Sequence, residues 1–232
     1  MAGEAEPQES TATSFTTLAA GPDFRHELEI KRSRFITVLR RADSEDAARA
    51  LVADLRREFH DARHHCSAFV LGAGRDIQRS SDDGEPSGTA GIPMLEALLR
   101  RETAPGVTDL SDVSAVVVRY FGGVLLGAGG LVRAYSESVS TALALSPLVQ
   151  RRRLRICAVR TPHAAAGRLE NDLRSAGYAM VDTGYEANSA VLRLALPDSP
   201  AALADAAGHL AAITAGAAAL EPEGIEWVDL SP

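Results

Sequence analysis

The first 150 residues alternate between stretches with apolar residues at helical spacing and short runs that are typical of strands. In the segment 45–59, apolar residues recur every three or four positions and predict a helix that Asp43 or Ser44 would cap. Two further helices are expected, one starting near Pro93 and one after Gly130. The last of these is expected to bury Leu131, Val132, Tyr135, Val139 and Leu143. Strands are expected at 26–31 and 34–39 (or as one bent strand), 65–71, 77–80 and 113–121.

From residue 154 onward the expected order is strand, helix, strand, strand, helix, strand, which is the order of a small ferredoxin-like domain. The two helices begin at the pairs Thr161-Pro162 and Ser199-Pro200. The strands are expected at 154–160, 178–185, 190–196 and 220–228, and the second helix is expected to turn Leu203, Ala207, Leu210 and Ala211 inward. The fold class is therefore α+β.

Three parts are expected along the chain. Residues 1–23 are interpreted as a flexible acidic tail, because they are rich in Ser, Thr and Ala and contain no Lys or Arg. Residues 24–150 are expected to form an N-terminal domain, and residues 154–230 the ferredoxin-like C-terminal domain. The basic stretch 150–153 is interpreted as the link between them.

Charge is distributed unevenly between these parts. The 232-residue chain has a formal charge of −7, which taken alone argues against a polyanionic partner. Residues 24–153, however, hold 19 basic and 17 acidic side chains, whereas residues 154–232 hold 5 basic and 10 acidic ones. All basic residues except Lys31 are Arg, whose planar fork suits phosphate or carboxylate, although a compositional bias would produce the same excess. An anion-binding surface is therefore expected only in the middle part.

The location of the protein is expected to be cytoplasmic. The two cysteines, Cys66 and Cys157, have neither zinc-site spacing nor the density of a disulfide scaffold, which indicates a reducing compartment. The N-terminus does not resemble a signal peptide. No apolar run approaches the ~20 residues of a membrane-spanning helix, so no membrane association is expected.

A glycine-rich turn between an expected strand and an expected helix is the first candidate for chemistry. The segment RYFGGVLLGAGGLVRAY, residues 119–135, could bind an anion through backbone N–H groups at the start of the helix, flanked by Arg119 and Arg133. Its spacing fits neither a P-loop nor the dinucleotide-binding fingerprint. The alternative is that the glycines serve tight turns and close packing. The candidate binding residues here are Arg119, Tyr120, Gly122, Gly123, Gly127, Gly129, Gly130 and Arg133.

A polar loop at residues 80–91 is the second candidate. It places three carboxylates, Asp82, Asp83 and Glu85, within four residues, followed by Ser87 and Thr89. Crowded carboxylates need a cation or N–H donors to compensate their repulsion. The alternative is a solvated turn whose side chains cap local N–H groups. The spacing does not match an EF-hand, and no bound metal or cofactor is predicted.

Two shorter segments add candidates. His64, next to His65 and Cys66, would provide with Asp82 or Asp83 the ingredients of an activated cysteine, although Cys66 in an apolar strand is more typical of a core. Arg34, which precedes Phe35, suits a phosphate or stacking contact, or simply a surface strand end. No catalytic residue is predicted.

Four stretches resemble the signature segments of the IMPACT family, and specifically its bacterial YigZ-like branch. They are KRSRFI (31–36), ARHHCSA (62–68), DDGEPSGTAGIPML (82–95) and RYFGGVLLGAGGLVRAY (119–135). The resemblance, which covers about residues 24–150, implies a fold like the second domain of a small-subunit ribosomal protein. It also implies a C-terminal domain similar to the ferredoxin-like domains of elongation factor G. Eukaryotic relatives modulate translation through an additional N-terminal domain, which this chain is expected to lack.

Three functional hypotheses follow. The first is a regulator of translation that binds RNA, the ribosome or a translation factor through the N-terminal domain. The second is a hydrolytic or nucleotide-directed enzyme that uses His64, Asp82, Asp83 and Glu85. The third is a scaffold that binds another protein through the acidic C-terminal domain.

Overall fold

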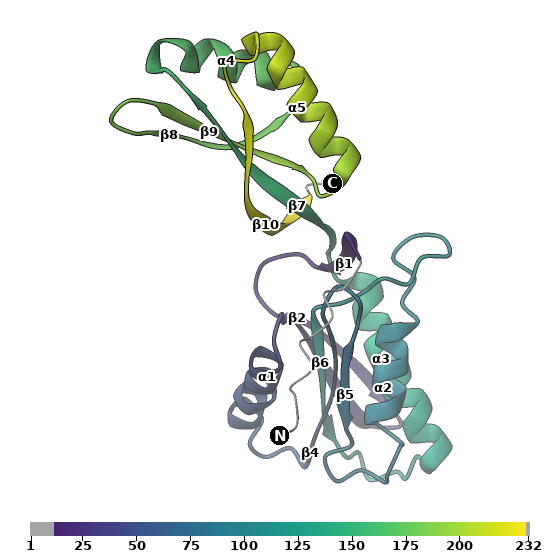
Figure 1. Cartoon of the computed structure of the whole chain (residues 1–232). Helices are drawn as coiled ribbons and strands as arrows, with labels where there is room; N and C mark the ends of the chain where they lie inside the picture. The colour runs from purple at the N-terminus through teal and green to yellow at the C-terminus, as the bar shows by residue number, and fades with distance from the viewer. Residues whose placement is uncertain (1–11, 231–232) are drawn as a thin grey trace, which may run out of the picture. The chain divides into compact units, whose positions relative to one another are not determined.

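The computed structural model describes residues 12–230, which divide into two compact units at Gln150 and Arg151. The elements of the first unit are β1 (Ser14–Leu18), β2 (Phe24–Ile30), β3 (Ser33–Arg41), α1 (Glu45–Glu58), β4 (His64–Leu71), β5 (Ile77–Ser81), α2 (Gly91–Leu99), β6 (Val113–Tyr120) and α3 (Ala128–Leu145) (Figure 1). The strand β7 (Leu148–Thr161) begins in the first unit and continues into the second. The remaining elements are α4 (His163–Ser175), β8 (Ala179–Tyr185), β9 (Ala190–Pro197), α5 (Pro200–Thr214) and β10 (Leu220–Leu230). The predicted α+β class is confirmed.

The first unit is built on an antiparallel sheet with the strand order β2-β3-β6-β4-β5. In this register Phe35 of β3 and His64 of β4 are both direct neighbours of Arg119 on β6. Because residues directly opposite each other in a sheet project to the same face, these three side chains lie in one row across the sheet.

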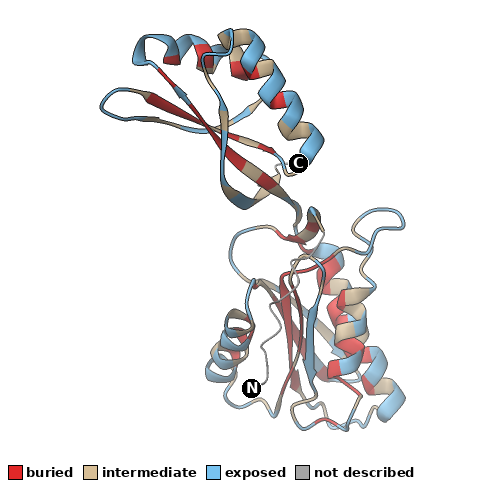
Figure 2. Cartoon of the chain, in the orientation of Figure 1, coloured by how far each residue is buried: buried red, intermediate tan, exposed pale blue. Residues whose placement is uncertain are grey.

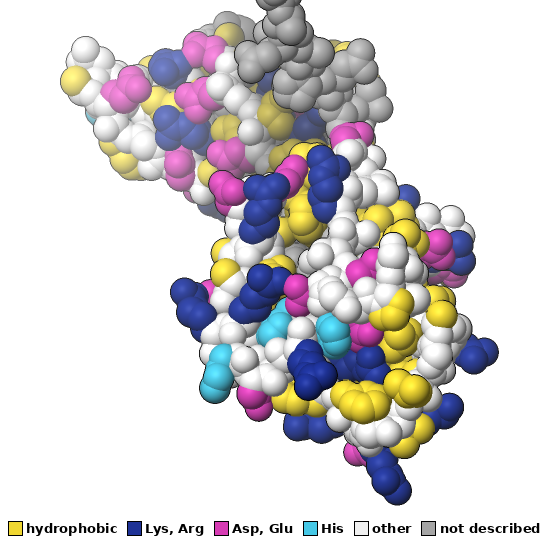
Figure 3. Space-filling model, turned by 90° about the horizontal axis from the view of Figure 1, so that it is seen from below, with side chains coloured by type: hydrophobic (Ala, Val, Ile, Leu, Met, Phe, Trp, Pro, Cys, Tyr) yellow, Lys and Arg dark blue, Asp and Glu magenta, His cyan; other side chains and the backbone are white. Residues whose placement is uncertain are grey.

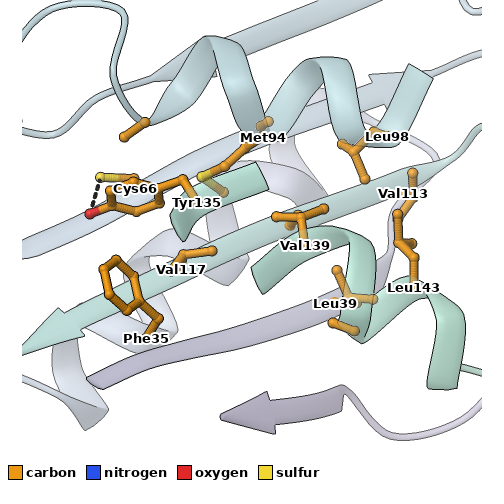
Figure 4. Packing of buried hydrophobic residues seen from close by; sticks show 14 of the residues in the cluster. Phe35, Leu39, Cys66, Met94, Leu98, Val113, Val117, Tyr135, Val139 and Leu143 are labelled. Carbon is orange, nitrogen blue, oxygen red and sulfur yellow. Dashed lines mark hydrogen bonds between the residues drawn. The ribbon is translucent and has the colours of Figure 1, made fainter. Parts of the chain in front are cut away.

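Helices cover both faces of this sheet. Helix α1 packs on one face through Leu51 and Leu55, which contact Val116 and Val118. Helices α2 and α3 pack on the other face, where the larger core lies (Figure 2). Tyr135 of α3 is fully buried there, with its ring edge against Phe35 and its hydroxyl hydrogen-bonded to Cys66 (Figure 4).

Local sequence accounts for two of the connections near the end of the sheet. Ser44 caps α1, its hydroxyl accepting a hydrogen bond from the amide of Ala47. Lys31 and Arg32 form a two-residue turn with φ values of 49° and 67°, so β2 and β3 are two strands of a hairpin and not one bent strand. Gly122 packs on this turn so closely that a Cβ atom would lie 2.1 Å from the carbonyl of Arg32. Any larger residue at position 122 would push the segment after β6 away from the hairpin.

The second unit has the sheet order β10-β7-β9-β8, with the order of elements βαββαβ expected from the sequence. This is the strand arrangement of a ferredoxin-like fold. Helices α4 and α5 cover one face of the sheet, and their buried residues include Leu169, Leu173 and Leu210.

Four sequence predictions need correction. Residues 14–18 of the predicted tail form β1, held by backbone hydrogen bonds between Thr16 and the segment 109–111; residues 1–11 lie outside the described residues. The stretch 150–153, where the two units divide, is a continuous part of the strand β7, and ion pairs to Asp229 and Asp198 hold Arg151 and Arg153. On α5, Ala206 is buried in place of Ala207 and Ala211, which are exposed. Val132 of α3 faces solvent.

Candidate functional site

A cavity of about 360 Å³ opens at the end of the first unit where β6 leads into α3. One wall comes from the polar loop through Glu85 and Pro86, and another from residues 125–128 of the glycine-rich turn. Arg63 and His64 at the start of β4, Arg119, Phe121 and Leu131 complete the lining. Figure 3 looks onto this end of the unit, where hydrophobic, basic and histidine side chains lie next to one another. The two segments that the sequence analysis singled out therefore share one cavity.

The first turn of α3 presents unused hydrogen-bond donors at this cavity. Gly127, in the N-cap position, and Ala128 both line the cavity, and no side chain caps the helix. Leu131 is the first residue whose amide donates, to the carbonyl of Gly127. Among the described residues, no acceptor contacts the amides of Ala128, Gly129 or Gly130. A helix start with free N–H groups attracts anions, because the donors and the helix dipole act together.

A buried guanidinium group lines the same cavity. Arg119 is only 7% exposed, and its Nη1 donates to Glu85 Oε1 over 2.6 Å. Its Nη2 lies 3.5 Å from the hydroxyl of Ser33, while its Nε has no partner within the described part of the chain. The guanidinium also faces the rings of Phe35 and Phe121, at 5.4 and 5.7 Å. Arg119 is thus fixed in direction and retains donors that the protein does not use.

Glu85 holds Arg119 in place. Its Oε1 accepts hydrogen bonds from both Arg119 and the hydroxyl of Tyr135, the latter at 2.8 Å. Burial and the adjacent Cys66 and Glu85 raise the pKa of Tyr135, so this hydroxyl stays protonated and acts as a donor. Glu85 therefore orients the guanidinium and partly offsets its charge.

The other two carboxylates of the polar loop are also bound within the first unit. Asp82 accepts hydrogen bonds from the amides of Gly88, Ala90 and Gly91 at the start of α2. Burial opposes ionisation of Asp82, but these three bonds outweigh it and lower the pKa of the carboxyl. Asp83 accepts from the amide of His65 and from Arg56. The interpretation of this loop as a turn that caps local N–H groups accounts for Asp82, whereas Asp83 joins the loop to β4 and α1.

His64 lines the cavity with its ring orientation set by the polar loop. Its Nδ1 lies 2.9 Å from the carbonyl oxygen of Asp83. Because a carbonyl only accepts, Nδ1 must carry the proton, and Nε2 of the neutral ring is left as an acceptor. Nε2 makes no hydrogen bond with the described residues.

Cys66 lies in the core and lacks the surroundings of a nucleophile. It is fully buried, and its thiol donates to the carbonyl of Asp82 and contacts Tyr135. Burial raises the pKa of the Cys66 thiol to about 12, so the thiolate is scarcely populated near neutral pH. Of the residues proposed for an enzyme, His64 and Glu85 line the cavity, whereas the carboxylates of Asp82 and Asp83 bond backbone amides and Arg56.

Several candidate residues lie away from the cavity. Arg34 pairs with Glu27 and lies over the ring of Tyr120, on the face of the sheet opposite to Arg119. Ser87 is exposed on the loop, and Arg133 is exposed on α3 outside the cavity lining. The Thr89 hydroxyl donates to the carbonyl of Pro86. Gly122 serves close packing, while Gly123 and Gly127 have positive φ values that favour glycine.

Sequence reasoning did not single out several residues of this site. Arg63 and Phe121 are each next to a candidate residue in the sequence, and Leu125 lies inside the glycine-rich segment. A single arginine or an apolar side chain forms no motif of its own, so the sequence did not distinguish these three residues from surface or core positions. Tyr135 was assigned to the core face of its helix, where it does lie, although its hydroxyl reaches Glu85.

The described residues contain neither a metal-binding cluster nor a helix that could span a membrane. Residues 12–230 contain no group of three or more His, Cys, Asp or Glu side chains placed to hold a metal ion. Within the same range, every helix is too short or too polar to cross a bilayer.

Comparison with known proteins agrees with the motifs. The Impact N-terminal domain matches residues 31–143. IMPACT family member YvyE of Bacillus subtilis (strain 168) is 42% identical over 174 residues, which cover 75% of this chain and 76% of YvyE. IMPACT family member YigZ of Escherichia coli (strain K12) is 53% identical over 117 residues, or 50% of this chain and 54% of YigZ. A solved structure titled "Crystal structure of an hypothetical protein" covers 91% of this chain and 98% of its own, with 38% identity and a TM-score of 0.58. The resemblance drawn from the four motifs is thereby confirmed, and the chain belongs to the IMPACT family.

Proposed function

We propose that this chain regulates translation by binding RNA, and that the cavity at the start of α3 holds a phosphate of the RNA backbone. The observation that carries the proposal is the convergence of two kinds of unused donor on one cavity. Within residues 12–230, no acceptor contacts the amides of Ala128, Gly129 and Gly130, and the Nε of the buried Arg119 has no partner. Helix N-termini and arginines are the groups that most often contact nucleic-acid phosphates.

The charges at the cavity mouth support a phosphate ligand. Arg63 is exposed at the rim, so it would add a second positive charge beside Arg119. Among the described residues of the lining, Glu85 alone is acidic, and its Oε1 already accepts from Arg119 and Tyr135. The lining therefore retains one net positive charge together with the positive end of the α3 dipole.

The second unit fits a nucleic acid less well. Arg160 pairs with Glu221, and Arg193 pairs with both Asp182 and Glu223. Residues 154–232 carry five more acidic than basic side chains. RNA would be repelled there, which favours the first unit as the binding surface.

RNA titration at several salt concentrations tests the proposal. We expect fluorescence anisotropy with a labelled single-stranded RNA to show binding that weakens as salt rises. Two arginines at the phosphates give a log–log slope between about −1 and −2, because each neutralised phosphate of a single strand contributes roughly −0.7. Absence of binding at about 50 mM salt, where such contacts are strong, would refute the proposal.

A further inference from the structure

We propose that the cavity receives one unpaired nucleotide, with its phosphate on the first turn of α3 and its base against Phe121. This inference rests on the proposed function and specifies the form of RNA that is bound. Single-stranded RNA, or an unpaired loop or end, is then the ligand, and a continuous duplex is not.

The aromatic ring beside the phosphate-binding groups is the first support. Phe121 is 53% exposed although it directly follows a buried strand, and it lines the cavity. The guanidinium carbon of Arg119 lies over this ring, 5.7 Å from the ring centre. An exposed phenyl ring next to a fixed arginine is a surface on which a nucleobase can stack.

The apolar surroundings of the cavity are the second support. Leu125 is 83% exposed, and it lies in the same short loop as Phe121, between β6 and α3. Leu126, Leu131 and Pro86 add further apolar lining. A phosphate gains nothing from contact with an apolar surface. The faces of a base do gain, because stacking and apolar contact remove the base and the apolar side chains from water.

The dimensions of the cavity restrict the ligand to one nucleotide. Its volume of about 360 Å³ is at the lower end of the range of small-molecule sites. In a duplex each base is stacked on both sides and paired along its edge, so its faces cannot reach Phe121. Phosphate contact and base contact in one cavity therefore require an unpaired nucleotide.

The test compares single-stranded and duplex RNA on the full chain. The probes are a labelled oligouridylate of about 12 nucleotides and the same strand paired with oligoadenylate. We expect the single strand to bind at least tenfold more tightly than the duplex. Phe121→Ala should weaken single-strand binding by about tenfold and leave duplex binding unchanged. Phe121→Trp, which keeps an aromatic ring, should bind the single strand as tightly as the wild type. Because Phe121 is exposed, the variants should unfold at the same temperature as the wild type.

Ile92→Ala is the matched control. Ile92 is also 53% exposed in the first unit, but it lies on α2 and does not line the cavity. Equal affinity for the two RNAs, or an equal loss from Phe121→Ala and Ile92→Ala, would overturn this inference while leaving RNA binding itself intact. Failure of both RNAs to bind would refute the proposed function as well.

Discussion

Gly129→Glu should weaken RNA binding by at least about 30-fold while leaving the protein folded. Gly129 is the second residue of α3 and follows Ala128, which lines the cavity; its amide is one of three in the first turn that have no acceptor among the described residues. A carboxylate at this position would occupy those donors and repel a phosphate. Each charge-assisted hydrogen bond to the ligand contributes about 1.5–3 kcal/mol, and 1.4 kcal/mol corresponds to tenfold in affinity.

The same substitution should stabilise the protein slightly. A Cβ atom at position 129 meets no heavy atom within 4 Å. Replacing a helical glycine and adding an acid in the first turn together contribute roughly 1 kcal/mol. Urea unfolding should therefore show an unchanged or higher free energy of unfolding, which separates loss of binding from loss of fold.

Ala164→Glu and Gly129→Gln are the matched controls. Ala164 is the exposed second residue of α4, so Ala164→Glu makes the same change of net charge at the same helical position in the other unit. Ala164→Glu should reduce RNA binding by less than about threefold, since it changes only the net charge of the chain and salt screens distant charges. Gly129→Gln measures the steric part of the effect without the charge. An equal loss in Gly129→Glu and Ala164→Glu would mean that the α3 cavity is not the binding site.

Glu85→Gln should destabilise the first unit by about 3–5 kcal/mol, because it leaves the buried guanidinium of Arg119 without a counter-charge. The side chain of Glu85 is 4% exposed, and that of Arg119 is 7% exposed. The free energy of unfolding of such domains is only about 5–15 kcal/mol, so the variant should unfold at a much lower urea concentration.

Two comparisons show whether the loss comes from the buried pair. Glu27→Gln makes the same change in an exposed ion pair with Arg34 and should cost less than about 1 kcal/mol. The double substitution Glu85→Gln with Arg119→Met should recover most of the stability, since an apolar replacement removes the unpaired charge. A Glu85→Gln variant that is no less stable than Glu27→Gln would contradict the structural role assigned to Glu85.

The periodic parts of the chain could be predicted from the sequence. The helix capped by Ser44 and the βαββαβ order of the second unit follow from local spacing and from Pro and Gly at the helix ends. β1 could not be predicted, because it is only five residues long and its hydrogen bonds go to residues far along the chain. The burial of Ala206 in place of Ala207 on α5 reflects a shift of one position on an alanine-rich helix, where many faces are equally apolar.

The candidate site could be predicted in part. Sequence patterns identified the polar loop and the glycine-rich turn, because each contains a dense group of special residues. They did not show that Glu85 bonds Arg119, whereas Asp82 bonds the loop itself and Asp83 bonds the amide of His65. That difference depends on strand register, which brings Phe35, His64 and Arg119 into one row from three distant segments. Register is a property of the whole sheet and is not encoded near any of these residues.

Backbone amide chemical shifts during an RNA titration test the central claim most directly. Glycine amides resonate apart from most others, so Gly129 and Gly130 can be followed in a ¹H–¹⁵N spectrum of the labelled full chain. We expect both signals to move on addition of the oligouridylate and to saturate together with the anisotropy signal, while Gly177 and Gly208 in the second unit stay in place. Binding that leaves the amides of Gly129 and Gly130 unchanged would contradict a phosphate site at the start of α3.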